Sequence, residues 1–129
     1  MSTSDEHFAD LADAARQGRA RILPSDPVGN AVPGSALESM ERIAWGDLWQ
    51  RGQLSTRERR LITLTCLALH GNERTIGLHL RGALDSGDLT AADLDAMTLQ
   101  IGIYAGFPRG SAFNGAVQRA LADRTDADS

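Results

Sequence analysis

Apolar residues recur every three or four positions through most of the chain, which is the spacing of amphipathic helices. Six stretches show this spacing: about 8–18, 36–52, 56–70, 72–86, 91–105 and 112–121. Strand signals are poor, because aromatic residues make up 5% of the chain and β-branched residues form no convincing period-two run. The pattern therefore predicts an all-α protein of about six helices.

Capping patterns mark several of these helix starts. The sequences SALE at 35–38 and STRE at 55–58 are capping boxes, and TAAD at 90–93 is a variant with Asp as its last residue. Gly71 and Gly87 follow the helices expected at 56–70 and 72–86, where glycine is a common C-terminal stop. Residues 24–33 hold three of the four prolines, so this segment is expected to be a connecting loop.

Two of the expected helices have unusual surfaces. The helix at 56–70 has apolar side chains all round, so we expect it to be buried on most sides. The helix at 91–105 has a core stripe that includes Leu94 and Ile101, and a second apolar face formed by Leu99 and Ile103. A helix with two apolar faces in a small protein indicates a subunit interface.

Length and composition limit the class of protein. With 129 residues, we expect a single domain over 1–129, with polar tails at about 1–5 and 123–129. The net charge of −4 gives no electrostatic basis for binding nucleic acid. The longest apolar run, 61–69, is too short to span a bilayer, and the first residues lack the features of a secretory signal. These observations predict a cytoplasmic protein without a membrane partner.

His79 is the first candidate for chemistry, because it follows the most apolar stretch of the chain and lies on an expected helix. It is either a hydrogen-bonded core or interface histidine, or a general acid or base in an apolar pocket. Thr75, one turn earlier, shares its helix face and could hydrogen-bond the imidazole. Glu73 lies roughly 120° away around the helix, so it is a poor direct partner.

Arg57, Arg59 and Arg60 form a basic cluster at a helix start, where the helix dipole disfavours cations. At least one of them is therefore expected to have a specific partner. That partner could be Glu58, Asp47 or a second copy of the chain. Alternatively, a guanidinium of this cluster could capture a substrate carboxylate, for which its fork geometry is suited.

The remaining candidates are aromatic and thiol side chains. Trp45 and Trp49 lie four residues apart on one expected helix. They are either core or interface residues, or they form a wall of a substrate site. Cys66, the only cysteine, excludes an internal disulfide and any zinc site that needs two cysteines. It lies in an apolar run, so a buried structural thiol is expected.

Four segments, in this order and spacing, resemble the carboxymuconolactone decarboxylase family. They are AWGDLWQRGQL (44–54), RERRLITLTCLALHG (57–71), LHLRGALDSG (78–87) and LQIGIYAGFPRG (99–110). The resemblance covers about 35–121, and GRARILP near the N-terminus is similar to the family's leader segment. It implies an all-helical homo-oligomer, commonly a trimer or hexamer. The namesake enzyme is a cofactor-free and metal-free lyase of aromatic catabolism, in the β-ketoadipate pathway, that removes CO2 from 4-carboxymuconolactone.

The resemblance also implies roles for individual residues. His79 matches the family's histidine. Thr75 stands where the decarboxylase branch typically has a glutamate, and Glu73 matches an acidic position often present just upstream. The family's flanking motif is matched by Trp45, Gly46, Arg57 and Arg59.

The peroxidase branch of the family uses a Cys-x-x-Cys pair just ahead of its histidine. Those two positions read Asn72 and Thr75 in this chain. Cys66 has no second cysteine with which to form a disulfide, and a dithiol cycle needs two. A thiol-dependent peroxidase is therefore excluded.

Taken together, the sequence predicts a cofactor-free lyase that removes CO2 from a small carboxylated lactone. The candidate catalytic residues are His79 as proton donor, Thr75 and Glu73; the candidate substrate-binding residues are Arg57, Arg59 and Trp45; no metal is expected. One alternative is a different cofactor-free enzyme, such as an isomerase or cyclase of secondary metabolism, which the Thr75 replacement motivates. Another is a non-catalytic helical oligomer.

Overall fold

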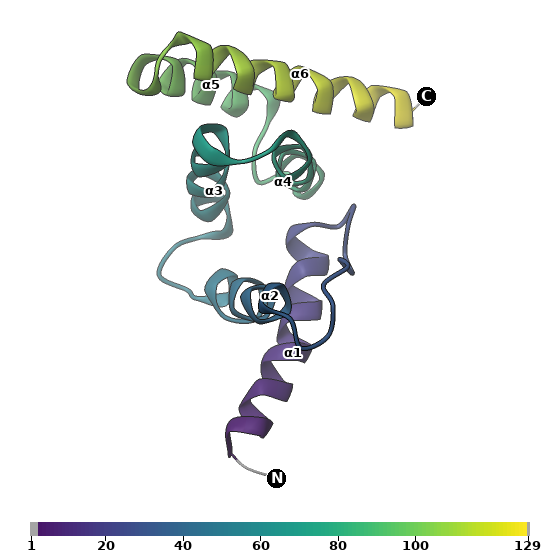
Figure 1. Cartoon of the computed structure of the whole chain (residues 1–129). Helices are drawn as coiled ribbons and strands as arrows, with labels where there is room; N and C mark the ends of the chain where they lie inside the picture. The colour runs from purple at the N-terminus through teal and green to yellow at the C-terminus, as the bar shows by residue number, and fades with distance from the viewer. Residues whose placement is uncertain (1–2, 129) are drawn as a thin grey trace. The chain divides into compact units, whose positions relative to one another are not determined.

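The computed structural model describes residues 3–128, and these residues fall into two compact units, 1–55 and 56–129 (Figure 1). The described residues form six α-helices and one short 3-10 helix, with no strand among them. The predicted all-α fold of about six helices is therefore confirmed. The single domain expected over 1–129 stays a prediction.

The first unit is a packed pair of helices with a connecting loop. It contains α1 (Thr3–Ile22), α2 (Ala36–Gly46) and the 3-10 helix η1 (Leu48–Gln50). Two glycines allow α1 and α2 to approach closely. A Cβ at Gly18 would lie 2.1 Å from the Trp45 carbonyl oxygen, and one at Gly46 would lie 2.7 Å from that of Leu11. Helix α1 therefore continues beyond its expected end at Gly18, because this glycine is a contact point inside the helix.

Arg19 fixes the loop between α1 and α2. Its buried guanidinium donates to the carbonyl and carboxylate of Asp26 and to Glu41. Gly29 approaches the same guanidinium with a φ of +73°, and a Cβ there would lie 2.8 Å from Arg19 Cζ. The loop expected at 24–33 is therefore present and is held by an arginine of the helix before it.

The second unit holds four helices: α3 (Thr56–His70), α4 (Glu73–Ser86), α5 (Ala91–Ala105) and α6 (Phe107–Asp128). Helices α5 and α6 form a hairpin, and α3 and α4 pack together beneath it in Figure 1. The core of this unit draws on all four helices. Its fully buried members include Leu64, Leu80, Leu94, Phe113 and Val117.

Helix ends follow the capping signals. Ser35 Oγ accepts from the backbone N–H of Glu38, and Thr90 and Asp93 make both bonds of a capping box. Gly87 ends α4 with a φ of 77°, the left-handed conformation that favours glycine. The predicted caps at 35 and 90 and the stop at 87 are thus confirmed.

Both ends of the helical region extend into segments that we expected to be polar tails. Helix α1 begins at Thr3, and α6 continues to Asp128. The extension of α6 has a tertiary cause, because Asp123 and Arg124 form ion pairs with Arg81 and Asp85 of α4. Residues 1–2 and 129 lie outside the described residues.

Helix α3 corrects two expectations. It is not buried on most sides: the face with Arg60, Leu64 and Ala68 is buried, whereas Ile62 is 52% exposed. Cys66 is exposed and is not a buried structural thiol. The reason is that, within its unit, α3 packs mainly against α4 and α6, which cover one face. Among the described helices, none is long and apolar enough to cross a membrane.

Candidate active site

His79 lies in the middle of α4, beside the stripe of that helix that enters the core. His79 is 7% exposed and lies on the same helix as the buried Ile76, Leu80 and Ala83. Asn72 sets the start of the helix, since its side chain accepts from the backbone N–H of Thr75. Histidine is the side chain most often used for general acid–base catalysis, so His79 is the residue of α4 best suited to proton transfer.

The two other predicted catalytic residues lie in the first turn of α4. Thr75 is half-buried and one turn before His79, so it shares that face of the helix as the sequence indicates. Glu73 points elsewhere. Its side chain is 88% exposed, and its carboxylate lies 3.7 Å from a guanidinium nitrogen of Arg119 in α6. Helix α4 therefore brings Thr75 and His79 together and leaves Glu73 apart from them.

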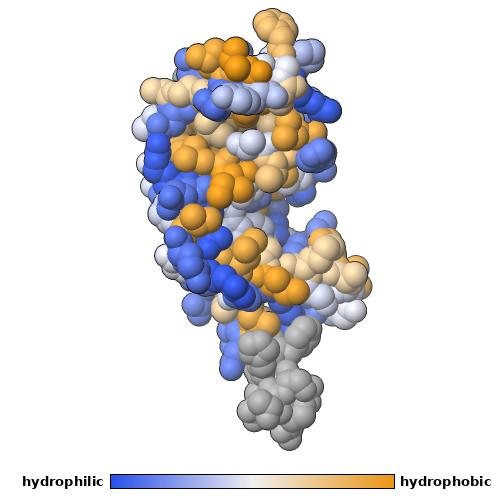
Figure 2. Space-filling view, turned by 90° about the vertical axis from the view of Figure 1, so that its left-hand side faces the viewer, coloured by the Kyte–Doolittle hydropathy of each residue, from blue (hydrophilic) through white to orange (hydrophobic). Residues whose placement is uncertain are grey.

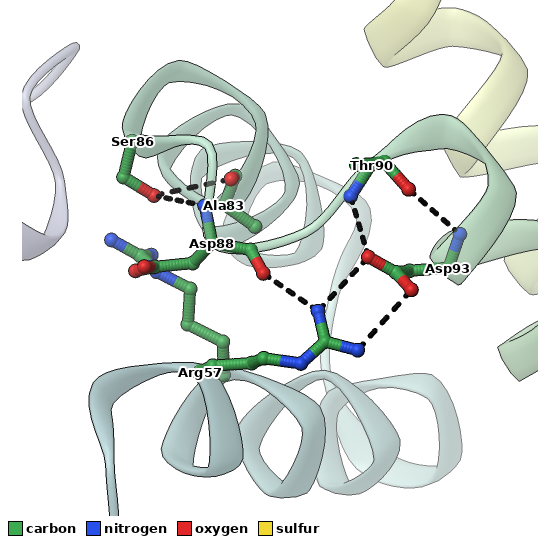
Figure 3. Close-up of polar contacts among 7 residues, drawn as sticks. Arg57, Ala83, Ser86, Asp88, Thr90 and Asp93 are labelled. Carbon is green, nitrogen blue, oxygen red and sulfur yellow. Dashed lines mark hydrogen bonds and ion pairs between the residues drawn. The ribbon is translucent and has the colours of Figure 1, made fainter.

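Arg57, at the start of α3, is held by Asp88 of the α4–α5 connection and by Asp93 in the first turn of α5 (Figure 3). Its guanidinium donates to both carboxylate oxygens of Asp93, at 2.9 and 3.2 Å, and to the Asp88 carbonyl at 2.8 Å. The hydrogen bonds that Arg57 donates to the Asp93 carboxylate raise the pKa of Arg57 and lower the pKa of Asp93. At least one arginine of this cluster therefore has the specific partner that we expected, since Arg57 pairs with Asp93.

Arg60 binds the same connection from inside the core. Its side chain is 1% exposed, and its Nε donates to Asp88 Oδ2 at 2.8 Å. Ser86 Oγ accepts from the backbone N–H of Asp88 and donates to the Ala83 carbonyl, which completes the turn (Figure 3). We call Arg57, Arg60, Asp88 and Asp93 the Asp88 clamp. It ties the start of α3 to the end of α4 and the start of α5.

Arg59 lies between the two clamp arginines in the sequence and is half-buried. Residues 57 and 60 are three apart and share a helix face, whereas residue 59 is turned roughly 100° from residue 60. The clamp uses Arg57 and Arg60, so Arg59 is the member of the basic cluster outside it.

Trp45, the remaining predicted site residue, belongs to the first unit and is 8% exposed. Its ring stacks on that of Trp49, with centroids 6.0 Å apart and planes inclined at 25°. Arg19 Cζ lies 5.8 Å from the Trp45 ring centroid, within the range of a cation–π contact. Trp45 also lines a cavity of about 220 Å³ with Arg16, Arg19, Glu41 and Arg42, among others. Its surroundings are thus a packed aromatic pair beside a charged cavity.

Sequence reasoning missed two acidic members of the clamp. Asp93 was identified only as the last residue of a helix cap and Asp88 was not singled out, because their partners lie 28 to 36 positions earlier in the chain. The one available signal was the presence of three arginines at a helix start, where the helix dipole disfavours cations. It indicates that partners exist but cannot identify them. Among the described side chains, no group of three or more His, Cys, Asp and Glu residues could hold a metal ion.

Comparisons with known proteins give one family and two similar enzymes. The model of the carboxymuconolactone decarboxylase family matches residues 35–119, which include α3, α4, α5 and the site residues from 45 to 79. A nitrosuccinic acid decarboxylase of Metarhizium robertsii is 32% identical over 115 residues, covering 83% of this chain and 78% of that enzyme. A 4-carboxymuconolactone decarboxylase of Acinetobacter baylyi is 34% identical over 73 residues, covering 57% of this chain and about half (54%) of that enzyme. No solved structure gives a significant match.

The match extends over most of the chain, and both relatives carry out decarboxylation. The expected resemblance is therefore confirmed: this decarboxylase-like chain is a member of the carboxymuconolactone decarboxylase family.

Proposed function

We propose that the protein is a cofactor-free carboxy-lyase that removes CO2 from a small carboxylic acid, with His79 as the proton donor. The observation that carries the proposal is the buried imidazole on α4, in a chain whose relatives are two decarboxylases. We further propose that the substrate is a small carboxylated lactone such as 4-carboxymuconolactone, as the sequence predicts.

The relatives' substrates suggest which acids suit the site. In 4-carboxymuconolactone the electrons left by CO2 can enter the conjugated lactone carbonyl, and in nitrosuccinic acid they can enter the nitro group. Each acid carries a second carboxylate besides the one that leaves. An acid of this type carries its own electron sink, so the protein needs to bind the remaining carboxylate, exclude water and protonate carbon.

Each step has a candidate residue. His79 delivers the proton to the carbon that has lost CO2, and Thr75 or a water molecule fixes its tautomer. Arg57 or Arg59 binds the remaining carboxylate, and the Arg57 guanidinium is already oriented by its hydrogen bonds to Asp93 and Asp88. Glu73, the acidic group at the start of α4, is a further candidate residue.

The test measures CO2 release from 4-carboxymuconolactone and from nitrosuccinate. We expect release from at least one, and His79→Ala to reduce turnover by about 10²-fold or more, the usual loss of a general acid. His70→Ala is the matched control, since His70 is an exposed histidine at the end of α3. Arg59→Lys tests the binding of the remaining carboxylate, and Glu73→Gln tests whether the acidic group at the start of α4 is needed for turnover. Full turnover in His79→Ala would refute the assignment.

A second candidate is a different cofactor-free enzyme on the same scaffold, of isomerase or cyclase type. It is favoured by Thr75, which replaces the glutamate typical of the decarboxylase branch. Conversion of either acid without CO2 release would support it. A non-catalytic helical oligomer is the remaining alternative, and it predicts that neither acid is converted. We further propose that the protein is a homo-trimer or homo-hexamer, as the family resemblance implies.

A further inference from the structure

A groove between α4 and α6 collects arginine side chains from both helices. We call it the α4–α6 groove; its charged lining consists of Arg74, Arg81 and Arg119 with Glu73 and Asp123. Its volume of about 450 Å³ lies within the range of small-molecule sites, about 300–1,000 Å³. At the end of the same unit where α5 meets α6, apolar residues gather instead (Figure 2). The groove is therefore locally basic, in a chain whose net charge is −4.

The acidic residues of the groove hold its arginines only loosely. A guanidinium nitrogen of Arg119 lies 3.7 Å from the Glu73 carboxylate, and one of Arg81 lies 3.5 Å from that of Asp123. The corresponding distances in the Asp88 clamp are 2.8 to 3.2 Å. The four side chains of the groove pairs are 39% to 88% exposed, and exposed pairs of this kind contribute little to stability. An incoming anion can therefore displace these contacts at little cost.

The floor of the groove is made of small and apolar residues. Gly77 lies inside α4, and a Cβ added to it would meet nothing within 4 Å. Ala116 and Ala120 are buried one turn apart on α6, and Leu78 completes the floor. Glycine is less favourable than alanine inside a helix, and the packing around Gly77 does not require it. Its effect is to leave the floor open.

The positions of the arginines indicate what the groove would bind. Arg119 contacts Glu73 at the start of α4, whereas Arg81 lies eight residues further along that helix, a rise of about 12 Å. Long arginine side chains at both ends can each donate parallel hydrogen bonds to a carboxylate. The apolar floor between them is suited to methylene groups. A short chain with a carboxylate at each end matches both features, whereas inorganic phosphate has no part that would use the floor.

The groove is separate from the proposed active site. Gly77 and Arg81 are four residues apart, so they share one face of α4. His79 is two positions from each of them, which turns it roughly 160° around the helix. Among the candidate residues of the active site, only Glu73 also lines the groove.

We infer that the α4–α6 groove is a second binding site, in which Arg81 and Arg119 hold the two ends of a short dicarboxylate. The inference is independent of the proposed function, because it rests on residues of α4 and α6 that face away from His79. Occupation of the groove would also join the two helices through the ligand.

The test is isothermal titration calorimetry of the full chain with glutarate. Low ionic strength is used because salt screens exposed charges. We expect a Kd of about 0.1–10 mM, the range of a weak binding site. Pentanoate has the same five carbons but one carboxylate, so it should bind at least about 10-fold more weakly. Inorganic phosphate should also bind more weakly than glutarate.

Variants locate the site. Arg81→Gln and Arg119→Gln should each weaken glutarate binding by at least about 10-fold, because each removes the partner of one carboxylate. Gly77→Leu fills the floor with a good helix former, so it should abolish binding while the helix is kept. Arg124→Gln is the matched control, since Arg124 also joins α6 to α4, through Asp85, but does not line the groove. It should bind like the wild type.

Far-UV circular dichroism checks that each variant keeps its helices. A wild type that binds no glutarate at about 10 mM would overturn the inference, as would equally tight binding of pentanoate or phosphate. Folded Arg119→Gln that binds glutarate like the wild type would do the same. Loss of binding in Arg59→Lys but not in Arg119→Gln would place the anion in the proposed active site instead. Because CO2 release is a separate measurement, a protein that binds glutarate in the groove but releases no CO2 refutes only the proposed function.

Discussion

Replacing Asp88 by asparagine removes one charge from the Asp88 clamp and leaves its shape. The amide of the new side chain still presents an oxygen to Arg60, and the backbone contacts of residue 88 with Arg57 and Ser86 are unchanged. The substitution therefore isolates the electrostatic part of the Arg60–Asp88 pair. The side chain of Arg60 is 1% exposed, so its cation cannot turn to water for compensation.

The expected loss follows from this burial. Breaking a buried ion pair by removing one partner costs about 3–5 kcal/mol, and the remaining hydrogen bond places this case near the lower end, at about 3 kcal/mol. Domains of this size have a total stability of about 5–15 kcal/mol, so this is a large fraction. With a urea m-value of about 1.5 kcal/mol per M, the midpoint should fall by about 2 M.

The assay is urea unfolding followed by two probes. Far-UV circular dichroism reports all the helices, whereas both tryptophans, Trp45 and Trp49, lie in the 1–55 unit. If the chain is one cooperative domain, both probes should show the same fall in midpoint for Asp88→Asn. If the units unfold separately, the fluorescence midpoint should stay unchanged while the dichroism midpoint falls.

The control is Asp47→Asn, which removes the carboxylate of the exposed Arg51–Asp47 pair. Exposed pairs contribute little, so the shift for this variant should be much smaller. A dichroism midpoint that moves no further in Asp88→Asn than in Asp47→Asn would refute the argument that burial gives the clamp its weight.

Three further predictions concern other features. Gly110→Ala should lower the melting temperature in a thermal scan, because the new Cβ would meet the backbone of α5 and such overpacking costs about 1–3 kcal/mol. Gly77→Ala has open space around its new Cβ, so it should raise the free energy of unfolding by about 1 kcal/mol. An opposite order would contradict this packing argument. The hydrogen bond from Arg57 lowers the pKa of Asp93 in the folded protein. The pair therefore stabilises the fold fully above the pKa of Asp93 in the unfolded chain, about 4, and this stabilisation is lost as the pH falls through the pKa of Asp93 in the folded protein. Acid titrations of wild type and Asp93→Asn should therefore show stabilities that converge as the pH falls below about 4. Finally, Cys66 is exposed, so it should react with a thiol reagent such as DTNB in the folded protein; protection until unfolding would show that its helix face is covered.

The sequence by itself determined the helices and the family. Apolar spacing predicted six helices, and the caps at Ser35 and Thr90 and the stop at Gly87 were correct, because such signals act over four or five residues. The segments around His79 were enough to indicate the family, and the second apolar face of the 91–105 helix was visible in its periodicity. These features depend on local chemistry and order along the chain.

Tertiary structure decided which apolar faces are covered and which charges meet. Periodicity shows that α3 is apolar all round, but only its neighbours determine that Leu64 is buried and Cys66 is exposed. The arginine cluster indicated that a partner was needed, but helix packing brought Asp88 and Asp93 to it from 28 to 36 positions away. Burial and ion pairing depend on distances in space, which the linear pattern does not contain.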